Sequence, residues 1–236
     1  MIILNSFRHF SFDLWMTLIR SNPEFKIQRS IYFFEKLNSK KKSIEVINKI
    51  FRQVDLLCNS INEKTGKNID SDEMYLAVLY LINDGADSFK DIDFSQLYEE
   101  MIGLTLNYHP VFYSHETLEV LQTMRETEGV SFSISSNTAF IKGATLREVL
   151  LNLGIGDFFD FQLYSDEINY SKPNKLFFET LINKAIAIDP DRNLKFTEII
   201  HIGDNENADI FGANNSGLSS YQINSNNLTI KNLISQ

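Results

Sequence analysis

The hydrophobic pattern of the chain changes near Ser114, and this change limits the folds that the sequence can adopt. Between residues 20 and 108, four segments carry apolar residues at helical spacing, with no strand pattern between them. Beyond Ser114, short apolar runs of strand length alternate with amphipathic helices. Such alternation is typical of a parallel sheet with right-handed crossovers. The first part instead predicts a small helical lobe packed on itself.

A first strand is predicted at residues 7–14, ahead of the helical segment. Phe7, Phe10 and Phe12 lead to a lone carboxylate, Asp13. A strand buried in a parallel sheet reads as a largely apolar run of this kind. We therefore predict an α/β fold, a doubly wound parallel sheet with a helical insertion after its first strand.

The remaining elements are predicted from periodicity and from helix-capping residues. Strands are expected at residues 130–135, 161–164, 198–203 and 220–223. Helices are expected to begin near Asn22, Ser43, Ser71 and Phe94, and to cover residues 117–126, 144–153, 176–187 and 208–215. Residues 165–167 are expected to lie in a loop.

Composition excludes several classes of partner. The chain has a net charge of −9, which repels nucleic acid and anionic membrane surfaces. A single cysteine, Cys58, rules out an internal disulfide and fits a reducing compartment. The apolar start, residues 1–4, is too short for a signal peptide or a membrane span. We expect a cytoplasmic protein, monomeric or homodimeric, that binds neither nucleic acid nor membrane.

Polar side chains fall at or just beyond the ends of the predicted strands. They are Asp13 with Thr17, Ser136 with Asn137, Lys172 before Pro173, and Gly203–Asp204 with Asp209. The carboxyl ends of parallel strands meet at one edge of a sheet, where ligands bind. Asp13 and Asp204 could share Mg²⁺, and Ser136 and Lys172 are suitable donors for phosphoryl oxygens. A carboxylate beside a cation stays ionised and can act as a nucleophile.

These stretches, in this order and at compatible spacing, resemble the motifs of the haloacid dehalogenase superfamily. The resemblance implies a Rossmann-like core formed by residues 1–19 and 109–236, and a helical cap formed by residues 20–108. It implies that Asp13 is the nucleophile, and that Asp13, the backbone carbonyl of Trp15 and Asp204 hold Mg²⁺. It further implies these roles: Ser136, Asn137 and Lys172 bind the transferring group, Asp209 supports Lys172 or the metal's water shell, and Thr17 braces the loop.

Trp15 departs from the phosphatases of this family, most of which carry a second aspartate at that position. That aspartate protonates the leaving group and later activates water, and an indole can do neither. The dehalogenase branch also has an aromatic residue there, but it needs no metal and usually has serine where this chain has Asp204. The chain therefore combines a feature of each branch.

Three functions follow from these features. The first is a Mg²⁺-dependent phosphatase that acts on a small phosphorylated metabolite through an aspartyl-phosphate. The second is a metal-independent, dehalogenase-like hydrolase, which Asp204 argues against. The third is a weakly active or non-catalytic ligand-binding protein, which Trp15 keeps open.

Overall fold

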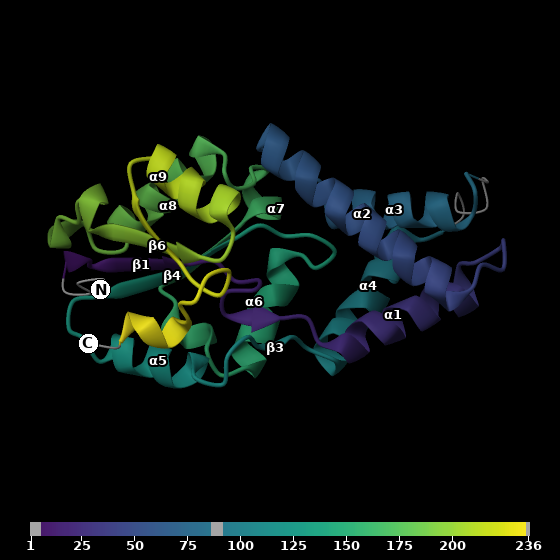
Figure 1. Ribbon diagram of the computed structural model, residues 1–236, viewed down its shortest axis with the longest axis horizontal. Coiled ribbons are helices and arrows are strands. Elements are labelled where there is room, and N and C mark those ends of the chain that lie inside the picture. The colour runs from purple at the N-terminus through teal and green to yellow at the C-terminus, as the bar shows by residue number, and fades with distance from the viewer. Residues whose placement is uncertain (1–5, 86–91, 235–236) are drawn as a thin grey trace.

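The computed structural model describes residues 6–85 and 92–234, so the ends of the predicted core and part of the predicted cap lie outside the described residues. The molecule is elongated, with two parts side by side along its long axis (Figure 1). One part is a sheet with helices on both faces, and the other is a group of helices. None of the helices in the described ranges has the length and hydropathy needed to cross a membrane.

The sheet has five strands, all parallel, in the order β5-β4-β1-β6-β7. Their bounds are β1 His9–Phe12, β4 Ser131–Ser136, β5 Phe161–Tyr164, β6 Ile199–Gly203 and β7 Ser219–Gln222. The first strand in sequence is thus the central one, with β4 and β6 on either side. This arrangement confirms the predicted α/β class with a doubly wound parallel sheet.

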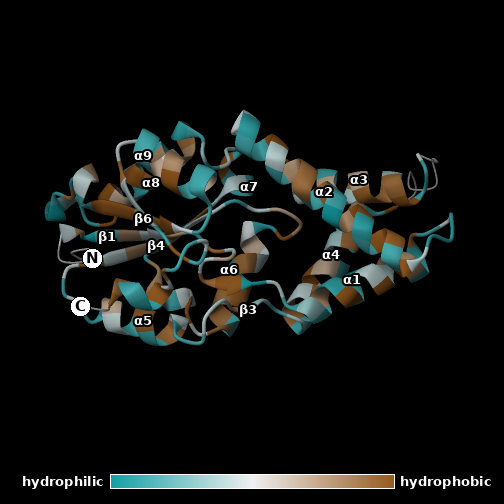
Figure 2. Ribbon diagram, viewed as in Figure 1, coloured by the Kyte–Doolittle hydropathy of each residue, from teal (hydrophilic) through white to brown (hydrophobic). Residues whose placement is uncertain are grey.

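One face of the sheet is apolar. Phe10 and Phe12 of β1 point to the same face because side chains alternate along a strand, and both are buried. They belong to a core cluster with residues of α5 (Thr117–Arg125) and α6 (Gly143–Asn152). On the opposite face, α8 (Lys175–Ala187) and α9 (Gly212–Asn215) contribute to a second cluster. Helices therefore cover both faces of the sheet (Figure 1), and the strands and the covering helices carry many hydrophobic residues, brown in Figure 2.

The other face of the central strands is polar, although it is fully buried. His9 of β1 bonds through its two ring nitrogens to the hydroxyls of Ser131 and Ser133, at 2.8 and 3.0 Å. Ser11, also in β1, bonds to His201 of β6 at 3.0 Å. Buried polar groups need partners of this kind, and here they satisfy each other across neighbouring strands.

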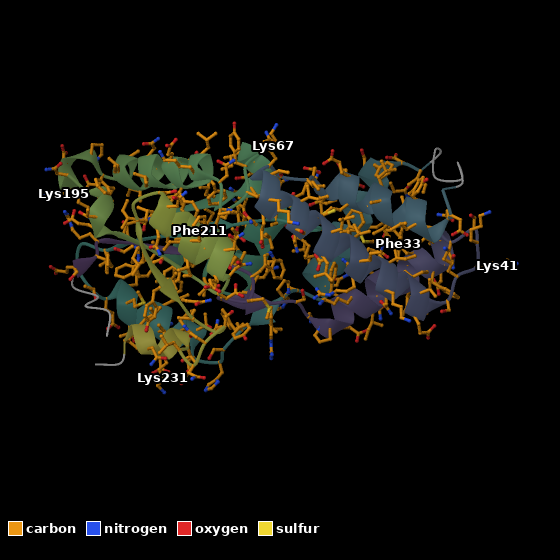
Figure 3. All side chains as sticks on the ribbon, turned by 45° about the horizontal axis from the view of Figure 1, so that its top comes forward. Phe33, Lys41, Lys67, Lys195, Phe211 and Lys231 are labelled. Atoms are coloured by element: carbon orange, nitrogen blue, oxygen red, sulfur yellow. The ribbon has the colours of Figure 1, made fainter. Side chains whose placement is uncertain are left out.

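The helices of the second part follow directly from their sequences. They are α1 Pro23–Lys36, α2 Ile44–Thr65, α3 Ser71–Ile82 and α4 Phe94–Asn107. Each begins at a residue whose side chain accepts a backbone N–H, as expected for N-caps: Asn22, Ser43, Asp70 and Asp93. They share a hydrophobic cluster that includes Phe33, labelled in Figure 3, and also Phe140 from the loop after β4.

The two segments that join the helices to the sheet lie side by side. The short strand β2 (Ile19–Arg20) pairs antiparallel with β3 (Val111–Phe112). These strands were not predicted, because two residues carry no readable periodicity. The chain therefore leaves the sheet and returns to it at one place.

Two local predictions were wrong in detail. Residues 165–167, expected in a loop, begin a short helix α7 (Ser165–Ile168), whose Asp166 carboxylate accepts the backbone N–H of Gly143. Residues 208–215, expected as one helix, form a π-helical stretch η6 (Glu206–Phe211) followed by α9. Tertiary hydrogen bonds and a local change of helical register leave no mark in a periodicity pattern.

The buried His9 should make stability depend on pH. Burial lowers the pKa of His9 from 6.5 to about 3, so between these values the unfolded chain binds a proton that the folded chain does not. Stability therefore falls as pH falls below 6.5, by about 1.4 kcal/mol between pH 7.5 and 5.5. Urea unfolding of the wild type and of His9→Asn at both pH values measures this. The difference in unfolding free energy between the two proteins should shrink by that amount at pH 5.5, and an unchanged difference would refute the assignment.

Candidate active site

Three carboxylates meet at the carboxyl edge of the sheet. Asp13 follows β1, Asp204 follows β6, and Asp209 lies in η6. One oxygen of each lies within 4.8 Å of the others. Parallel neighbouring strands bring Asp13 and Asp204 together, and the π-helical stretch after β6 places Asp209 beside them.

Lys172 connects two of these carboxylates. Its Nζ donates to Oδ1 of Asp13 at 2.7 Å and to Oδ1 of Asp209 at 2.6 Å, and its side chain is 1% exposed. Burial alone would lower the pKa of Lys172, but the two carboxylates outweigh burial and hold its pKa above the ordinary value. An ammonium has three N–H donors, so one remains for a ligand.

Asp209 is held on every side. Besides Lys172, its Oδ1 accepts a hydrogen bond from Nε2 of His201 at 3.1 Å, and its Oδ2 accepts the backbone N–H of Asn205 at 3.0 Å. Burial favours its neutral form, but Lys172 and His201 outweigh burial and place its pKa well below the ordinary value. A Cβ on Gly203 would lie 2.3 Å from this carboxylate. Asp209 is therefore a fixed anion that positions Lys172.

Asp13 and Asp204 carry negative charge that the protein compensates less fully. Burial raises the pKa of Asp13 to about 7 against the opposing effect of Lys172, with Asp209 and Asp204 adding to the rise. Burial, with a contribution from Asp209, raises the pKa of Asp204 to about 6. Three carboxylates thus lie close together with one ammonium, which contacts two of them, and the excess negative charge favours a further cation.

The donor set fits Mg²⁺. This ion prefers oxygen ligands, typically one or two carboxylates, and keeps water or substrate phosphate on its other positions. Asp209 accepts three hydrogen bonds from the protein, two on Oδ1 and one on Oδ2, whereas each oxygen of Asp13 accepts one. Asp13 and Asp204 therefore have more lone pairs left for direct contact with a metal ion.

The loop after β1 places Asp13 by local hydrogen bonds. Oγ1 of Thr17 donates to Oδ2 of Asp13 at 3.0 Å. Met16 adopts a left-handed conformation, with φ of 59°, which is unfavourable for a non-glycine residue. The Asn224 side chain donates to the carbonyls of Met16 and Thr17, at 2.8 and 3.1 Å. Trp15 packs against the core and lines the cavity beside Asp13.

The structure places Ser136 and Asn137 at the end of β4, but their side chains face protein groups. Nδ2 of Asn137 donates to the carbonyl of Lys172 at 3.0 Å, and its Oδ1 accepts the N–H of Lys172 at 2.7 Å. Ser136 is fully buried and bonds to the carbonyl of Asn137. Asn137 lines the cavity, whereas Ser136 is not one of the lining residues. In this arrangement Asn137 fixes the backbone of Lys172.

A cavity of about 560 Å³ opens over this cluster and extends between the two parts of the molecule. The ends of β1, β4 and β6 form its floor, together with Lys172. The opposite wall comes from α1 and α2, with Phe25, Arg29, Phe51 and Glu63 among the lining residues. Its volume suits a small organic molecule.

The C-terminal end of α2 is tied to the sheet part on the side away from β2 and β3. Glu63 accepts hydrogen bonds from the amides of Asn205 and Asn207, at 3.1 and 3.2 Å. The carbonyl of Gly66 accepts from Nδ2 of Asn174 at 2.9 Å, and a Cβ on this glycine would clash with that side chain. Lys67, just beyond, marks this junction in Figure 3. The helical part therefore contacts the sheet part on two sides of the cavity, at β2 and β3 and at the end of α2.

Sequence reasoning missed His201, Asn205, Glu63 and Arg29. His201 is a polar residue inside a buried strand, and that exception to an apolar pattern was a usable signal. Glu63 and Arg29 sit in ordinary amphipathic helices, where periodicity does not tell which residues turn to a cavity rather than to solvent.

Comparison with known proteins identifies relatives over part of the chain. A glyceraldehyde 3-phosphate phosphatase of Methanothermobacter thermautotrophicus is 33% identical over 102 residues, 42% of this chain and 40% of that protein. The pyrimidine 5′-nucleotidase YjjG of Escherichia coli is 33% identical over 82 residues, 34% of each chain. The matches thus span about two fifths of the curated relatives or less.

Solved structures share the fold over nearly the whole chain. The HAD-hydrolase YfnB of Bacillus subtilis, solved with magnesium bound, superposes with a TM-score of 0.69 at 17% identity, covering 92% of this chain and 89% of that one. A HAD phosphatase of Thermococcus onnurineus gives a TM-score of 0.61 at 20% identity, covering 93% and 87%.

A family model for the haloacid dehalogenase-like hydrolases matches residues 7–217. That range contains the three converging aspartates and Lys172, and it covers most of the chain. The chain therefore belongs to the haloacid dehalogenase-like hydrolase family.

Proposed function

We propose that this protein is a Mg²⁺-dependent phosphatase acting on a small phosphorylated metabolite through an aspartyl-phosphate on Asp13. The observation that carries the proposal is the cluster at the sheet edge. There the buried ammonium of Lys172 contacts Asp13, whereas Asp204 makes no ion pair with it. Two curated relatives named for phosphate-ester hydrolysis support the same activity.

In the first step, a carboxylate oxygen of Asp13 attacks phosphorus. A bond forms between that oxygen and phosphorus, the bond from phosphorus to the leaving oxygen breaks, and the leaving group departs with the electron pair. The free N–H of Lys172 donates to a phosphoryl oxygen and offsets its charge. Thr17 holds Asp13 in position through its hydrogen bond to Oδ2.

In the second step, water attacks the phosphorus of the aspartyl-phosphate and releases inorganic phosphate, which restores the Asp13 carboxylate. Asp13, Asp204 and the backbone carbonyl of Trp15 would hold Mg²⁺, which neutralises charge on the phosphoryl group. Asp209, together with Asp13, keeps Lys172 charged, and His201 holds Asp209 in place. Trp15 supplies no proton to the leaving group and takes none from water.

Residues 20–108 are proposed to act as a cap that closes over the site. The paired strands β2 and β3 form the natural hinge, and the bonds of Glu63 and Gly66 to the opposite side hold the closed form. Closure of such a lobe excludes water from the reaction.

Asp204 favours this function over dehalogenation. Halide displacement by Asp13 needs no metal and no leaving-group proton, so it would gain nothing from a second carboxylate at the end of β6. The structural similarity to 2-haloacid dehalogenases, such as that of Pseudomonas syringae at a TM-score of 0.59 and 17% identity, shows the fold alone.

Asp13→Asn should abolish hydrolysis while the fold is kept. The amide has almost the same volume but cannot attack phosphorus, so the rate on phosphomonoesters should fall by at least about 10³-fold. A panel of phosphorylated metabolites, assayed with Mg²⁺ and with EDTA, measures this. Wild-type activity should require Mg²⁺. Hydrolysis of 2-chloropropionate in EDTA, with no activity on any phosphate ester, would contradict the proposal.

Trp15 should make hydrolysis depend strongly on the leaving group. Aryl and acyl phosphates leave as stable anions, whereas alkyl phosphates need a proton, so their rates should lag by an additional factor of about 10²–10⁴. Trp15→Asp should narrow this gap, although losing the indole's packing limits the rescue.

The measurement is kcat on an aryl and an alkyl phosphate at saturating Mg²⁺, for the wild type and for Trp15→Asp. Equal wild-type rates would mean that another group supplies the proton. Asp55 and Glu63 also line the cavity, and their amide variants would then identify it.

A further inference from the structure

Arg29 occupies an unusual position in the cavity wall. It lies in α1, lines the cavity, and is 7% exposed. Its guanidinium carbon lies 3.9 Å from the ring centroid of Phe51, 4.8 Å from that of Phe140 and 5.3 Å from that of Phe25. Such stacking fixes the plane of the guanidinium, so the group is rigid as well as buried.

This cation lacks a paired anion in the described part of the chain. No carboxylate of the described residues lies within 4.0 Å of its guanidinium, and its Nε–H has no hydrogen-bond partner. Asp55 acts on Arg29 only from a greater distance. A guanidinium keeps its proton in proteins, and an unpaired buried charge is costly. Aromatic faces compensate the charge in part, and the neutral Tyr75 side chain hydrogen-bonds to the guanidinium, but among the residues that the structure describes the Nε–H has no acceptor and no anion balances the charge.

Arg52 on α2 shows the contrast within the same cavity. Its Nη1 pairs with Oδ2 of Asp55 at 3.2 Å, and its side chain is 67% exposed. The positive charge of Arg52 is therefore balanced by Asp55 and solvated by water. Of the two arginines that line the cavity, Arg29 is the one prepared for a ligand.

We propose that Arg29 binds a second oxyanion group, a carboxylate or a phosphate, carried by the substrate whose phosphoryl group is attacked by Asp13. The inference rests on the proposed phosphatase function and names its substrate class, phosphomonoesters with a further anionic group. The planar fork of a guanidinium matches the oxygens of either group. Both Arg29 and the Asp13 cluster line one continuous cavity, so one small molecule can contact both.

Matched esters test the proposal. Phosphoglycolate and 2-hydroxyethyl phosphate differ only in whether a carboxylate or a hydroxymethyl group follows the phosphate-bearing carbon, and ethane-1,2-diol bisphosphate carries a second phosphate instead. In the wild type, kcat/KM for at least one of the two substrates with a second anionic group should exceed kcat/KM for 2-hydroxyethyl phosphate by roughly 10–100-fold. A higher kcat/KM for phosphoglycolate would identify the second group as a carboxylate, and a higher value for the bisphosphate would identify it as a phosphate.

Variants assign this preference to Arg29. Arg29→Met keeps the packing volume but removes the charge, and it should bring the ratio close to one. Arg29→Lys should keep part of it, because a point charge remains without the planar fork. Arg52→Met, the matched control, should retain the wild-type ratio. Thermal unfolding of each variant verifies that it is folded.

The outcomes separate this inference from the phosphatase proposal. Hydrolysis of all three esters at equal kcat/KM by the wild type, or a ratio unchanged in folded Arg29→Met, would overturn the role of Arg29 and leave the phosphatase proposal standing. If none of these esters and no aryl or acyl phosphate is hydrolysed in the presence of Mg²⁺, the phosphatase proposal fails. Calorimetric binding of the same three compounds to the wild type and to Arg29→Met then decides the role of Arg29 by itself, since equal affinities would refute it.

Discussion

The site depends on one buried ion cluster, in which the ammonium of Lys172 lies between Asp13 and Asp209. Removing one partner from such a cluster leaves an unpaired buried charge, which typically costs about 3–5 kcal/mol. The protein therefore surrounds the cluster with further support. His201 and the backbone of Asn205 hold Asp209, and both ends of the Asn137 amide hold the backbone of Lys172.

The buried polar face of the sheet connects the fold to this site. Ser11 and His201 lie opposite each other on β1 and β6, and the His201 ring reaches Asp209. Burial lowers the pKa of His201, so the ring is neutral. Its Nε2–H donates to the carboxylate, and its Nδ1 accepts from the Ser11 hydroxyl. The strands thus form the apolar core on one face, and on the other face their polar side chains position Asp209 in the ion cluster at the sheet edge.

Much of this could be read from the sequence, for identifiable reasons. Asp13 and Asp204 follow strands that an apolar run marks clearly, and a parallel sheet must bring the ends of such strands to one edge. The alternation of strands and helices and the run of four helices after the first strand follow from the same periodicity, whereas the order of the strands within the sheet was not predicted. Residues whose role depends on orientation could not be predicted. Arg29 and Glu63 belong to helices with ordinary patterns, and the inward turn of the Asn137 amide depends on the loop that carries Lys172.

The central claim is that the phosphoryl group passes through a covalent bond to Asp13. The stereochemical course at phosphorus tests it most directly, with a phosphorothioate monoester made chiral by 16O and 18O and hydrolysed in water labelled with 17O. Two successive in-line displacements, first by Asp13 and then by water, each invert the configuration. The account predicts net retention in the chiral inorganic thiophosphate released. Net inversion would mean that water attacks the ester in one step, and would contradict a nucleophilic Asp13.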